Sequence, residues 1–552
     1  MHAAAVVYGR LHVMAAQSRY ATLEHFTQPV TRHPKPAPMV SDGKRDSSGI
    51  RMSKSTRLAV WLITNICFVM LVAAAASLRG GDPRVLYVSA LFALCSVPIL
   101  CLDRLNGSYV LLGILAPVYF VLFGMLDLVG MLFGAYPPST AAGADVAEWG
   151  IISGMTCILL GYFAGVRAAR SPGAERRATA DWPPSSILFV GLAVWLIGSI
   201  AILYLQIYVL PEKTAEAQRR GLADMGPVLT FAVMLGSLLA PLGMLILAYG
   251  YARFRTTLWF ATSIGLMLAQ LAIGFVTDIR GQALMPPILV VVALTLIDNK
   301  LPRAWLVGSL AVIVVCFPIL TAYRAAITGE RGLSREQAVQ NLSKVIDVVL
   351  AYRDTAVEHP GQEGRSLFFE RLSVKDNVER VFTHTGVDVP FQRGATLAAI
   401  PLAFIPRLVL PDKVDVPTGR LFNHTFYDRS DPDTYISPSS LGELYWNFGW
   451  PGLVAGTLLV GALLGFVAAK CNLAEHASVT RMLVLLATVQ YLCFGFEGAM
   501  SVSYISWLRS LGAIAILHLL FARTIAVRRP DSGLSVPHPA PAAMARFPNI
   551  MR

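Results

Sequence analysis

The segment LAVWLITNICFVMLVAAAASL, residues 58–78, carries no charged side chain and decides the class of fold. A helix needs about 20 mostly apolar residues to cross the roughly 30 Å hydrocarbon core of a bilayer. Residues 58–78 meet this length, and comparable segments recur along the rest of the chain. We therefore expect an all-α integral membrane protein.

About twelve segments of this kind are present. They lie at 58–78, 85–102, 109–133, 149–169, 187–210, 227–252, 258–277, 283–297, 304–323, 451–469, 480–497 and 504–522. The predicted regions are a cytoplasmic disordered tail (1–57), transmembrane helices 1–9 (58–323), a large and mostly helical periplasmic loop (324–450), transmembrane helices 10–12 (451–522) and a second cytoplasmic disordered tail (523–552). The polar start of the chain leaves open whether translation begins at Met1 or at Met52.

The overall composition agrees with lipid as the main solvent. Of 552 residues, 55% are hydrophobic and only 14% are charged, whereas soluble proteins carry about 25% charged residues. The net charge of +12 is largely the positive-inside bias of a multi-pass protein, so we do not expect nucleic acid as a partner. The 7 cysteines lie in or beside apolar segments without a CxxC pair, which argues against disulfides and structural zinc.

The distribution of Lys and Arg predicts the orientation. The loops at 167–186 and 253–255 carry arginines, whereas the loop at 134–148 carries no basic residue. Basic loops stay in the cytoplasm. Together with an even number of helices, this predicts cytoplasmic termini and a periplasmic position for 324–450.

Two basic features lie on the opposite, periplasmic side. They are Arg280, in TDIRGQ (277–282), and the pair Arg219 and Arg220 in the preceding outer loop. Cations on the unfavoured side of a membrane protein suggest a function. The alternative is that short outer loops tolerate one or two arginines.

Three ionisable residues lie inside apolar segments near their predicted outer ends: Asp127, Glu497 and Arg509. Charged groups are costly there unless they are paired. They either line a cleft for an anionic substrate or bridge each other, and we favour a structural pair between Glu497 and Arg509.

The large loop has the pattern of a folded segment. Residues 365–382 form an amphipathic stretch, which predicts a helix. Residues 397–413 are apolar but contain three prolines, so we expect a surface-lying or re-entrant segment and not a span. The end of the loop is rich in aromatic residues and leads directly into the tenth predicted helix.

Several stretches in and near this loop resemble one family. They are RLSVKDNVERV (371–381), IPRLVLPDK (405–413), SPSSLGELYWNFGWPGLVAG (437–456), TDIRGQAL (277–284) and YRAAITG (323–329). Together they resemble the bacterial Wzy-type O-antigen polymerases, also called oligosaccharide repeat unit polymerases. The resemblance is strongest over about 270–465 and is only topological elsewhere.

This resemblance implies a glycosyltransferase C-like enzyme of the bacterial inner membrane with its active site facing the periplasm. Its substrates would be undecaprenyl-diphosphate-linked oligosaccharides, which it would polymerise into O-antigen or exopolysaccharide without a metal or other cofactor. Membrane lipids, a chain-length regulator and a flippase are the further partners that the resemblance suggests.

The expected chemistry selects the candidate residues. Arginine suits a diphosphate leaving group because its planar guanidinium donates two parallel hydrogen bonds and stays protonated. The cations expected to bind diphosphate or glycan are Arg280, Arg324, Arg407, Lys413, Arg420, Arg219 and Arg220.

A base that removes the proton of the acceptor hydroxyl speeds its attack. Glu443 is the first candidate and His424 the second, since imidazole titrates near neutral pH. Glu443 has an alternative role as a helix cap or an arginine partner, and His424 as a surface residue. Tyr445 either stacks on a sugar ring or belongs to an interfacial aromatic belt.

Two other functions remain open at this point. An O-antigen ligase would use a similar donor but transfer the glycan to lipid A core, and the LGELYWNFGW stretch (441–450) favours the polymerase. A lipid-linked oligosaccharide flippase or exporter would be no enzyme. Such a transporter should carry charged groups near the bilayer midplane, interrupted helices and paired repeats.

Overall fold

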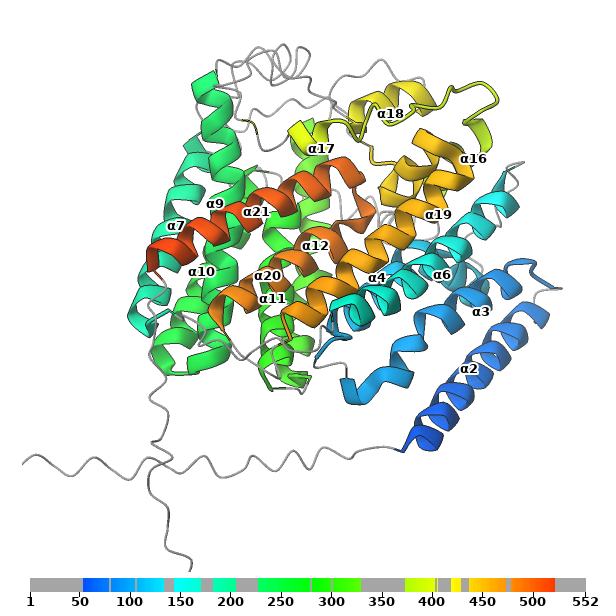
Figure 1. Ribbon diagram of the computed structural model, residues 1–552, viewed down its shortest axis with the longest axis horizontal. Coiled ribbons are helices and arrows are strands. Elements are labelled where there is room, and N and C mark those ends of the chain that lie inside the picture. Colours follow the sequence, from blue (N-terminus) through cyan, green and yellow to red (C-terminus); the bar gives the residue numbers. More distant parts are fainter. Residues whose placement is uncertain are drawn as a thin grey trace, which may run out of the picture. The chain divides into compact units, whose positions relative to one another are not determined.

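The computed structural model describes most of the chain between Ser53 and Phe521, and in this part helices are the only regular elements beyond one isolated bridge between Thr385 and Val389 (Figure 1). The described residues are 53–78, 81–104, 107–133, 143–169, 182–204, 227–277, 280–298, 301–328, 373–402, 405, 418–427, 436–472 and 478–521. Within these ranges, only the backbone is described at 102–104, 227–235, 237, 275–277, 280–283, 317–318 and 321–328.

The helices up to residue 328 coincide with the predicted apolar segments. They are α2 (Lys54–Ser77), α3 (Arg84–Cys95), the 3-10 helix η1 (Val97–Arg104), α4 (Val110–Phe123), α5 (Met125–Phe133), α6 (Ala144–Ala169), α7 (Pro184–Tyr204), α9 (Pro227–Phe254), α10 (Thr257–Thr277), α11 (Arg280–Asp298) and α12 (Arg303–Thr328). The side chain of Ser53 accepts a hydrogen bond from the backbone N–H of Thr56 and so caps the start of α2.

The remaining helices come from the predicted loop and from the C-terminal part. They are α16 (Lys375–His384), α17 (Ala399–Leu402), α18 (Thr418–Tyr427), α19 (Ser439–Lys470), α20 (Val479–Thr488), the π-helix η4 (Val489–Cys493), the 3-10 helix η5 (Phe494–Glu497) and α21 (Met500–Phe521). Because α12 continues to Thr328 and α19 begins at Ser439, both helices extend into the predicted loop of 324–450.

Among the described residues, 8 helical segments are long and apolar enough to cross a membrane, or up to 9 if the bent pair α4–α5 is one span. Three shorter apolar helices are Leu238–Phe254, Leu284–Asp298 and Arg303–Cys316. The chain is therefore an all-α membrane protein.

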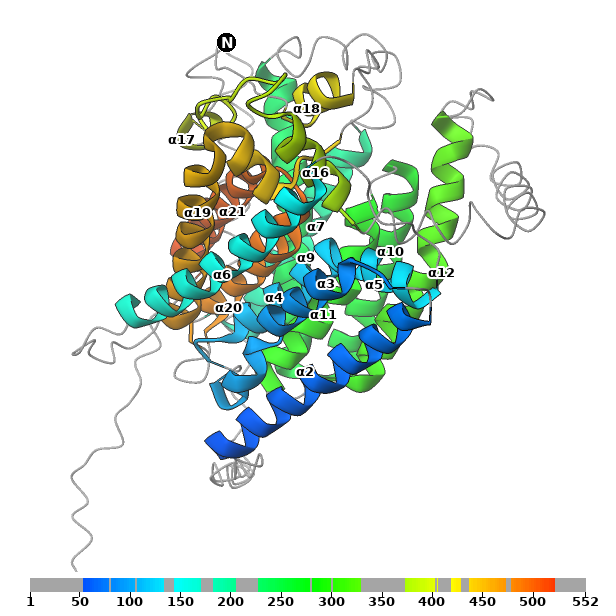
Figure 2. The same cartoon turned by 90° about the vertical axis from the view of Figure 1, so that its right-hand side faces the viewer.

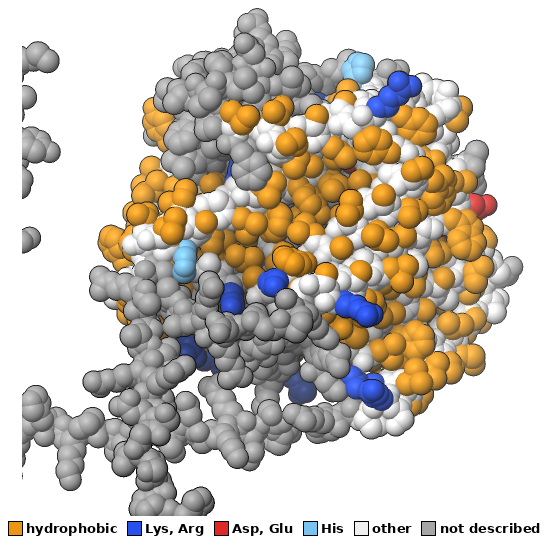
Figure 3. Space-filling view, in the orientation of Figure 1, with side chains coloured by type: hydrophobic (Ala, Val, Ile, Leu, Met, Phe, Trp, Pro, Cys, Tyr) orange, Lys and Arg blue, Asp and Glu red, His pale blue; other side chains and the backbone are white. Residues whose placement is uncertain are grey.

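Hydrophobic side chains cover much of the molecular surface, as one face illustrates (Figure 3). On α2 the side chains of Ile63 and Met70 are 60% and 68% exposed, and Leu519 on α21 is 82% exposed. Aliphatic side chains at this level of exposure fit contact with lipid and not with water.

Two of the predicted apolar segments, 109–133 and 480–497, are interrupted, which their hydropathy did not predict, and the helix that contains the segment 451–469 is broken just before this segment. The axis bends by 52° between α4 and α5, at Gly124. Inside α19, Gly449 has φ 63° and ψ −148°, a conformation that a side chain rarely allows. The helix α20 continues into a π-turn and a 3-10 turn before α21 starts, and π-turns often occur at functional sites.

The helices α6 and α19 lie side by side in unusually close contact (Figures 1 and 2). A Cβ atom added to Gly161 or Gly165 of α6 would lie 2.0 Å from a backbone oxygen of α19. A Cβ added to Gly461 or Gly465 of α19 would lie 2.2 or 2.1 Å from a backbone oxygen of α6. Each helix thus presents a G-x-x-x-G pair to the other, which is how helices approach closely in membranes.

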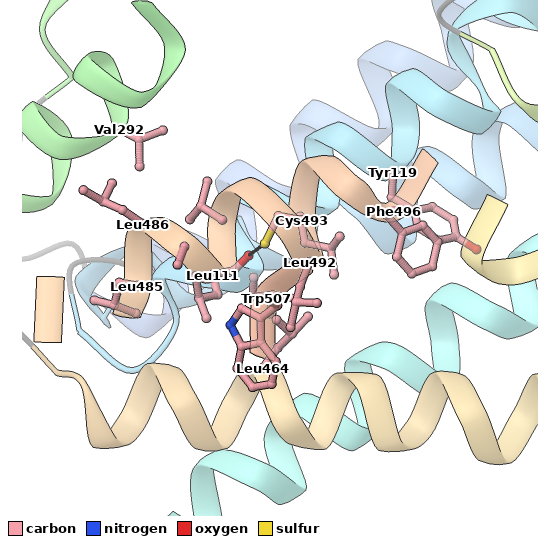
Figure 4. Packing of buried hydrophobic residues seen from close by; sticks show 14 of the residues in the cluster. Leu111, Tyr119, Val292, Leu464, Leu485, Leu486, Leu492, Cys493, Phe496 and Trp507 are labelled. Atoms are coloured by element: carbon pink, nitrogen blue, oxygen red, sulfur yellow. Dashed lines mark hydrogen bonds between the residues drawn. The ribbon is translucent and has the colours of Figure 1, made fainter. Parts of the chain in front are cut away.

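A hydrophobic core fills the space beside this helix pair (Figure 4). Leu111, Leu464 and Leu485 are completely or almost completely buried there together with Cys493. The indole N–H of Trp507 donates to Thr488 Oγ1 at 3.0 Å, so the polar group of the largest side chain in this region has a partner.

Candidate functional site

The helix α16, from the predicted loop, is attached to the ends of three other helices by a buried lysine. Lys375 Nζ lies 2.6 Å from Asp127 Oδ2 of α5 and 2.7 Å from Glu148 Oε1 of α6. It also lies over the ring of Tyr87 of α3, 4.4 Å from the centroid. One side chain therefore joins the loop to α3, α5 and α6.

In this Lys375 cluster, each charged side chain lies close to one of opposite charge. Arg84 lies 3.4 Å from Asp127 and 2.7 Å from Asp82, and Glu379 lies 3.6 Å from Lys375. Lys375 is 4% exposed and Asp127 is 7% exposed. The predicted need for a partner of Asp127 is thus met by Lys375 and Arg84, whereas the described side chains of Glu497 and Arg509 form no ion pair with each other.

The protonation state of Lys375 follows from its surroundings. Burial lowers the pKa of Lys375, but attraction to Asp127 and Glu148 raises it more, and the pKa ends above its usual value. Lys375 therefore keeps its charge at neutral pH, and the ion pairs that attach α16 persist there.

The same helix also packs on the start of α19, mainly through its C-terminal half. The rings of Phe382 and Tyr445 are stacked, with centroids 3.8 Å apart at 18°. Asn377 Nδ2 donates to the backbone oxygen of Ser437 at 2.9 Å. Tyr445, which was predicted to bind glycan or to join an aromatic belt, is only 8% exposed and packs against protein in this conformation.

The break at Gly449 leaves carbonyl groups free at the end of the first part of α19, and the turn at 392–394 uses them. The N–H groups of Gln392 and Arg393 each donate to a backbone oxygen at 3.0 Å, from Trp446 and Asn447 respectively. Asn447 Oδ1 accepts from the Gly394 N–H at 2.9 Å, and its amide donates to Thr396 Oγ1 at 2.7 Å. The turn is thereby fixed to the broken helix.

Glu443, the first candidate base, lies inside this region. It is fully buried, and its Oε2 accepts from the backbone N–H of Ser501 in the first turn of α21 at 3.0 Å. Its Oε1 has no hydrogen-bond partner in the part of the chain that the structure describes. This geometry matches the capping role left open by the sequence, since a carboxylate at a helix N-terminus satisfies a free N–H and the helix dipole.

The helix α18 covers the same region and carries two further candidates. Its apolar face, with Phe422 and Phe426, packs edge-to-face on Trp446, and Thr418 Oγ1 lies 3.0 Å from Ser501 Oγ. His424 is exposed, and Arg420 is partly buried. The structure thus brings α18 into the region of Glu443 and Tyr445 but directs His424 outward.

Of the remaining predicted cations, two have only their backbone among the described residues and four lie outside these residues. Arg280 begins α11 and Arg324 lies near the end of α12, and only their backbones are described. Because α11 and α12 contact each other and are joined by a short connection at 299–302, these two arginines belong to the same end of an antiparallel pair. The candidates outside the described residues are Arg219, Arg220, Arg407 and Lys413.

The sequence pattern did not single out Lys375 and Arg393 as candidate residues. For Lys375 a signal existed, because it lies on the face of α16 that carries the apolar residues Val374, Val378 and Phe382. A lysine within an apolar stripe indicates a buried partner. For Arg393, which has φ 49°, no local pattern indicated the left-handed conformation.

Among the described residues, no group of three or more His, Cys, Asp or Glu is arranged to hold a metal ion. No family model, no curated protein and no solved structure matches the chain.

Proposed function

We propose that this protein is a glycosyltransferase of the bacterial inner membrane that polymerises oligosaccharide repeat units carried on undecaprenyl diphosphate. In this proposal twelve helices cross the membrane, both termini are cytoplasmic, and the region 324–450 faces the periplasm. The apolar helices support the membrane location, and the distribution of Lys and Arg supports the direction.

The observation that carries the proposal is the packing of two stretches that resemble the polymerase family. The stretch 371–381 supplies most of α16, and the stretch 437–456 supplies the start of α19. They are far apart in the sequence, yet they are in contact through Phe382 and Tyr445 and through Asn377 and Ser437. Segments that build one functional site are expected to lie together, and these two do.

The leaving group of the proposed reaction is a lipid diphosphate, which keeps its negative charge as the glycosidic bond breaks. Arg280 and Arg324 are assigned to this charge, because both lie at one end of the α11–α12 pair, where a membrane-bound carrier presents its phosphates. Fixed cations that face developing charge lower the barrier of such a step. The cations of 407–420 are the second group available for this role.

The acceptor is a sugar hydroxyl, and its proton needs a base. In the described conformation the exposed His424 is accessible to such a hydroxyl, whereas Glu443 is covered and holds the first turn of α21. We therefore assign the general base to His424 and a positioning role to Glu443. General bases typically contribute 10²–10⁴-fold to a rate.

The test uses the purified full-length protein with a lipid-diphosphate-linked repeat unit in detergent or nanodiscs. A ladder of products that differ by one repeat unit supports polymerisation. Single transfer of the glycan to lipid A core makes the protein a ligase. Movement of the lipid-linked unit across the membrane without new glycosidic bonds refutes the enzyme. A loss of turnover in Arg280→Ala at unchanged expression supports the diphosphate assignment, and full turnover contradicts it.

A further inference from the structure

A small surface of three aromatic rings and one arginine surrounds the break in α19. Phe391, Phe448 and Trp450 are 39%, 47% and 37% exposed, and Arg393 is exposed beside them. A Cβ added to Gly394 would lie 3.0 Å from the ring of Phe448, and one added to Gly449 would lie 3.2 Å from the ring of Phe391. Phe391, Arg393, Phe448 and Trp450 are called the arginine–aromatic surface below.

The backbone of Arg393 is held in an unfavourable conformation at this surface. Its φ of 49° belongs to the left-handed region, which is uncommon for residues other than glycine, asparagine and aspartate. Its own N–H is bound to the oxygen of Asn447, and the N–H of Gly394 is bound to the side chain of Asn447. The position of the arginine is thus fixed by the broken helix.

The charge of Arg393 is uncompensated within the described part of the chain. Arg84, Arg255 and Lys375 each pair with a carboxylate there, but no ion pair is formed by Arg393 with a described residue. An exposed arginine whose backbone is held in place, and which forms no ion pair with a described residue, is suited to bind an anion from outside.

The depth of this surface in the membrane follows from the length of α19. From Trp450 to Lys470 the helix spans about 30 Å at 1.5 Å per residue, which equals the thickness of the hydrocarbon core. Lys470 marks one end of this span. The other end, at Gly449, therefore lies at the level of the lipid head groups, where phosphate is the abundant anion and exposed aromatic rings are favoured.

We propose that the arginine–aromatic surface binds an anionic phospholipid, with Arg393 contacting the phosphate and the three rings contacting the glycerol and upper acyl region. An aromatic belt alone would need no arginine with a constrained backbone beside it. A zwitterionic lipid brings an ammonium group that competes with Arg393 for the phosphate, so the site prefers a lipid with net negative charge. This inference depends on the membrane location of α19 and is independent of the proposed enzymatic activity.

The test measures lipid retention by the full-length protein in nanodiscs that contain phosphatidylcholine and phosphatidylglycerol, followed by partial delipidation and native mass spectrometry. We expect retained phosphatidylglycerol to fall about fivefold in Arg393→Asn and to stay near the original level in Arg393→Lys. Asparagine tolerates the left-handed conformation, so this variant removes the charge while keeping the turn. Phe448→Leu should weaken retention of both lipids.

Equal retention of the two lipids by the unaltered protein, or unchanged phosphatidylglycerol in Arg393→Asn, overturns the proposal. A second measurement does not depend on the variants. Short-chain phosphatidylglycerol added to the unaltered protein in detergent should raise its melting temperature, and inorganic phosphate at equal concentration should not. Equal shifts by both would indicate an unspecific phosphate effect and refute a lipid site.

Discussion

The contact between α6 and α19 makes the sharpest prediction for stability. A methyl group at position 161 would lie 2.0 Å from the backbone oxygen of Leu458, and one at position 461 would lie 2.2 Å from that of Ile158. Carbon and oxygen atoms that are not bonded pack at about 3.5 Å. Because the obstacle is backbone on both sides, no side chain can rotate away, and the two helices must separate by about 1.3–1.5 Å.

The size of the effect follows from two opposing contributions. Overpacking in a closely packed interface costs typically about 1–3 kcal/mol, and separation of two long helices belongs at the upper end of this range. Replacing glycine by alanine inside a helix gains about 1 kcal/mol. Gly161→Ala and Gly461→Ala should therefore each lower the free energy of unfolding by about 2 kcal/mol.

The assay is thermal unfolding in detergent micelles at a fixed scan rate, followed by circular dichroism. Gly265→Ala in α10 and Gly512→Ala in α21 are matched controls, because a Cβ there has no heavy atom within 4 Å, and they should leave the melting temperature unchanged or raise it. The Gly161→Ala/Gly461→Ala double variant should lower the free energy of unfolding by less than the sum of the two single-variant effects, because one separation of the helices makes room for both methyl groups. A melting temperature of Gly161→Ala equal to that of the controls would refute the close contact.

Three further predictions concern the loop and the proposed reaction. Lys375→Met leaves buried carboxylates without their cation and should lower stability by about 3–5 kcal/mol in the same melting assay; an unchanged melting temperature would contradict the cluster. The pKa of Lys375 is higher in the folded state than in the unfolded state. The charged lysine therefore stabilises the folded state fully below the unfolded-state pKa of about 10.4, and this stabilisation is lost as the pH rises through the folded-state pKa. The stability difference between the original protein and Lys375→Met should thus be constant from about pH 7 to 9.5 and shrink above about pH 10.5. In the polymerisation assay, His424→Asn should lower turnover by about 10²-fold or more, whereas Glu443→Gln, which still accepts from Ser501, should retain most of it; the reverse order would make Glu443 the base.

The sequence predicted the helices well because a span is a local property. Length and hydropathy identify each apolar segment without knowledge of its neighbours. The bend at Gly124 and the π-helix after α20 were not predicted. The predicted start of the tenth span, at residue 451, lies next to the break at Gly449, and the N–H groups of the turn at 392–394 bind the carbonyl groups that this break frees. Pro451 is a local signal of this break, because a proline lacks the N–H that would bond to the carbonyl group four residues earlier.

In the candidate site, properties of single residues were predictable from the sequence, but their partners were not. The burial cost of Asp127 predicted that it needs a partner, but its partner Lys375 lies 248 residues away. The G-x-x-x-G pairs at 161–165 and 461–465 are visible in the sequence, yet only the structure pairs them with each other. Pairwise contacts between distant segments are set by tertiary packing, which one sequence does not encode in any local pattern.

The two attachments of α16 differ in what they contribute. Stacking of Phe382 on Tyr445 buries apolar area, which stabilises but tolerates small shifts in position. The Lys375 cluster gains little net energy, because removing its charges from water is costly, but it is satisfied only when Nζ meets Asp127 and Glu148 together. Apolar contact therefore holds α16 against α19. The ion pairs determine the position of α16 relative to the ends of α5 and α6.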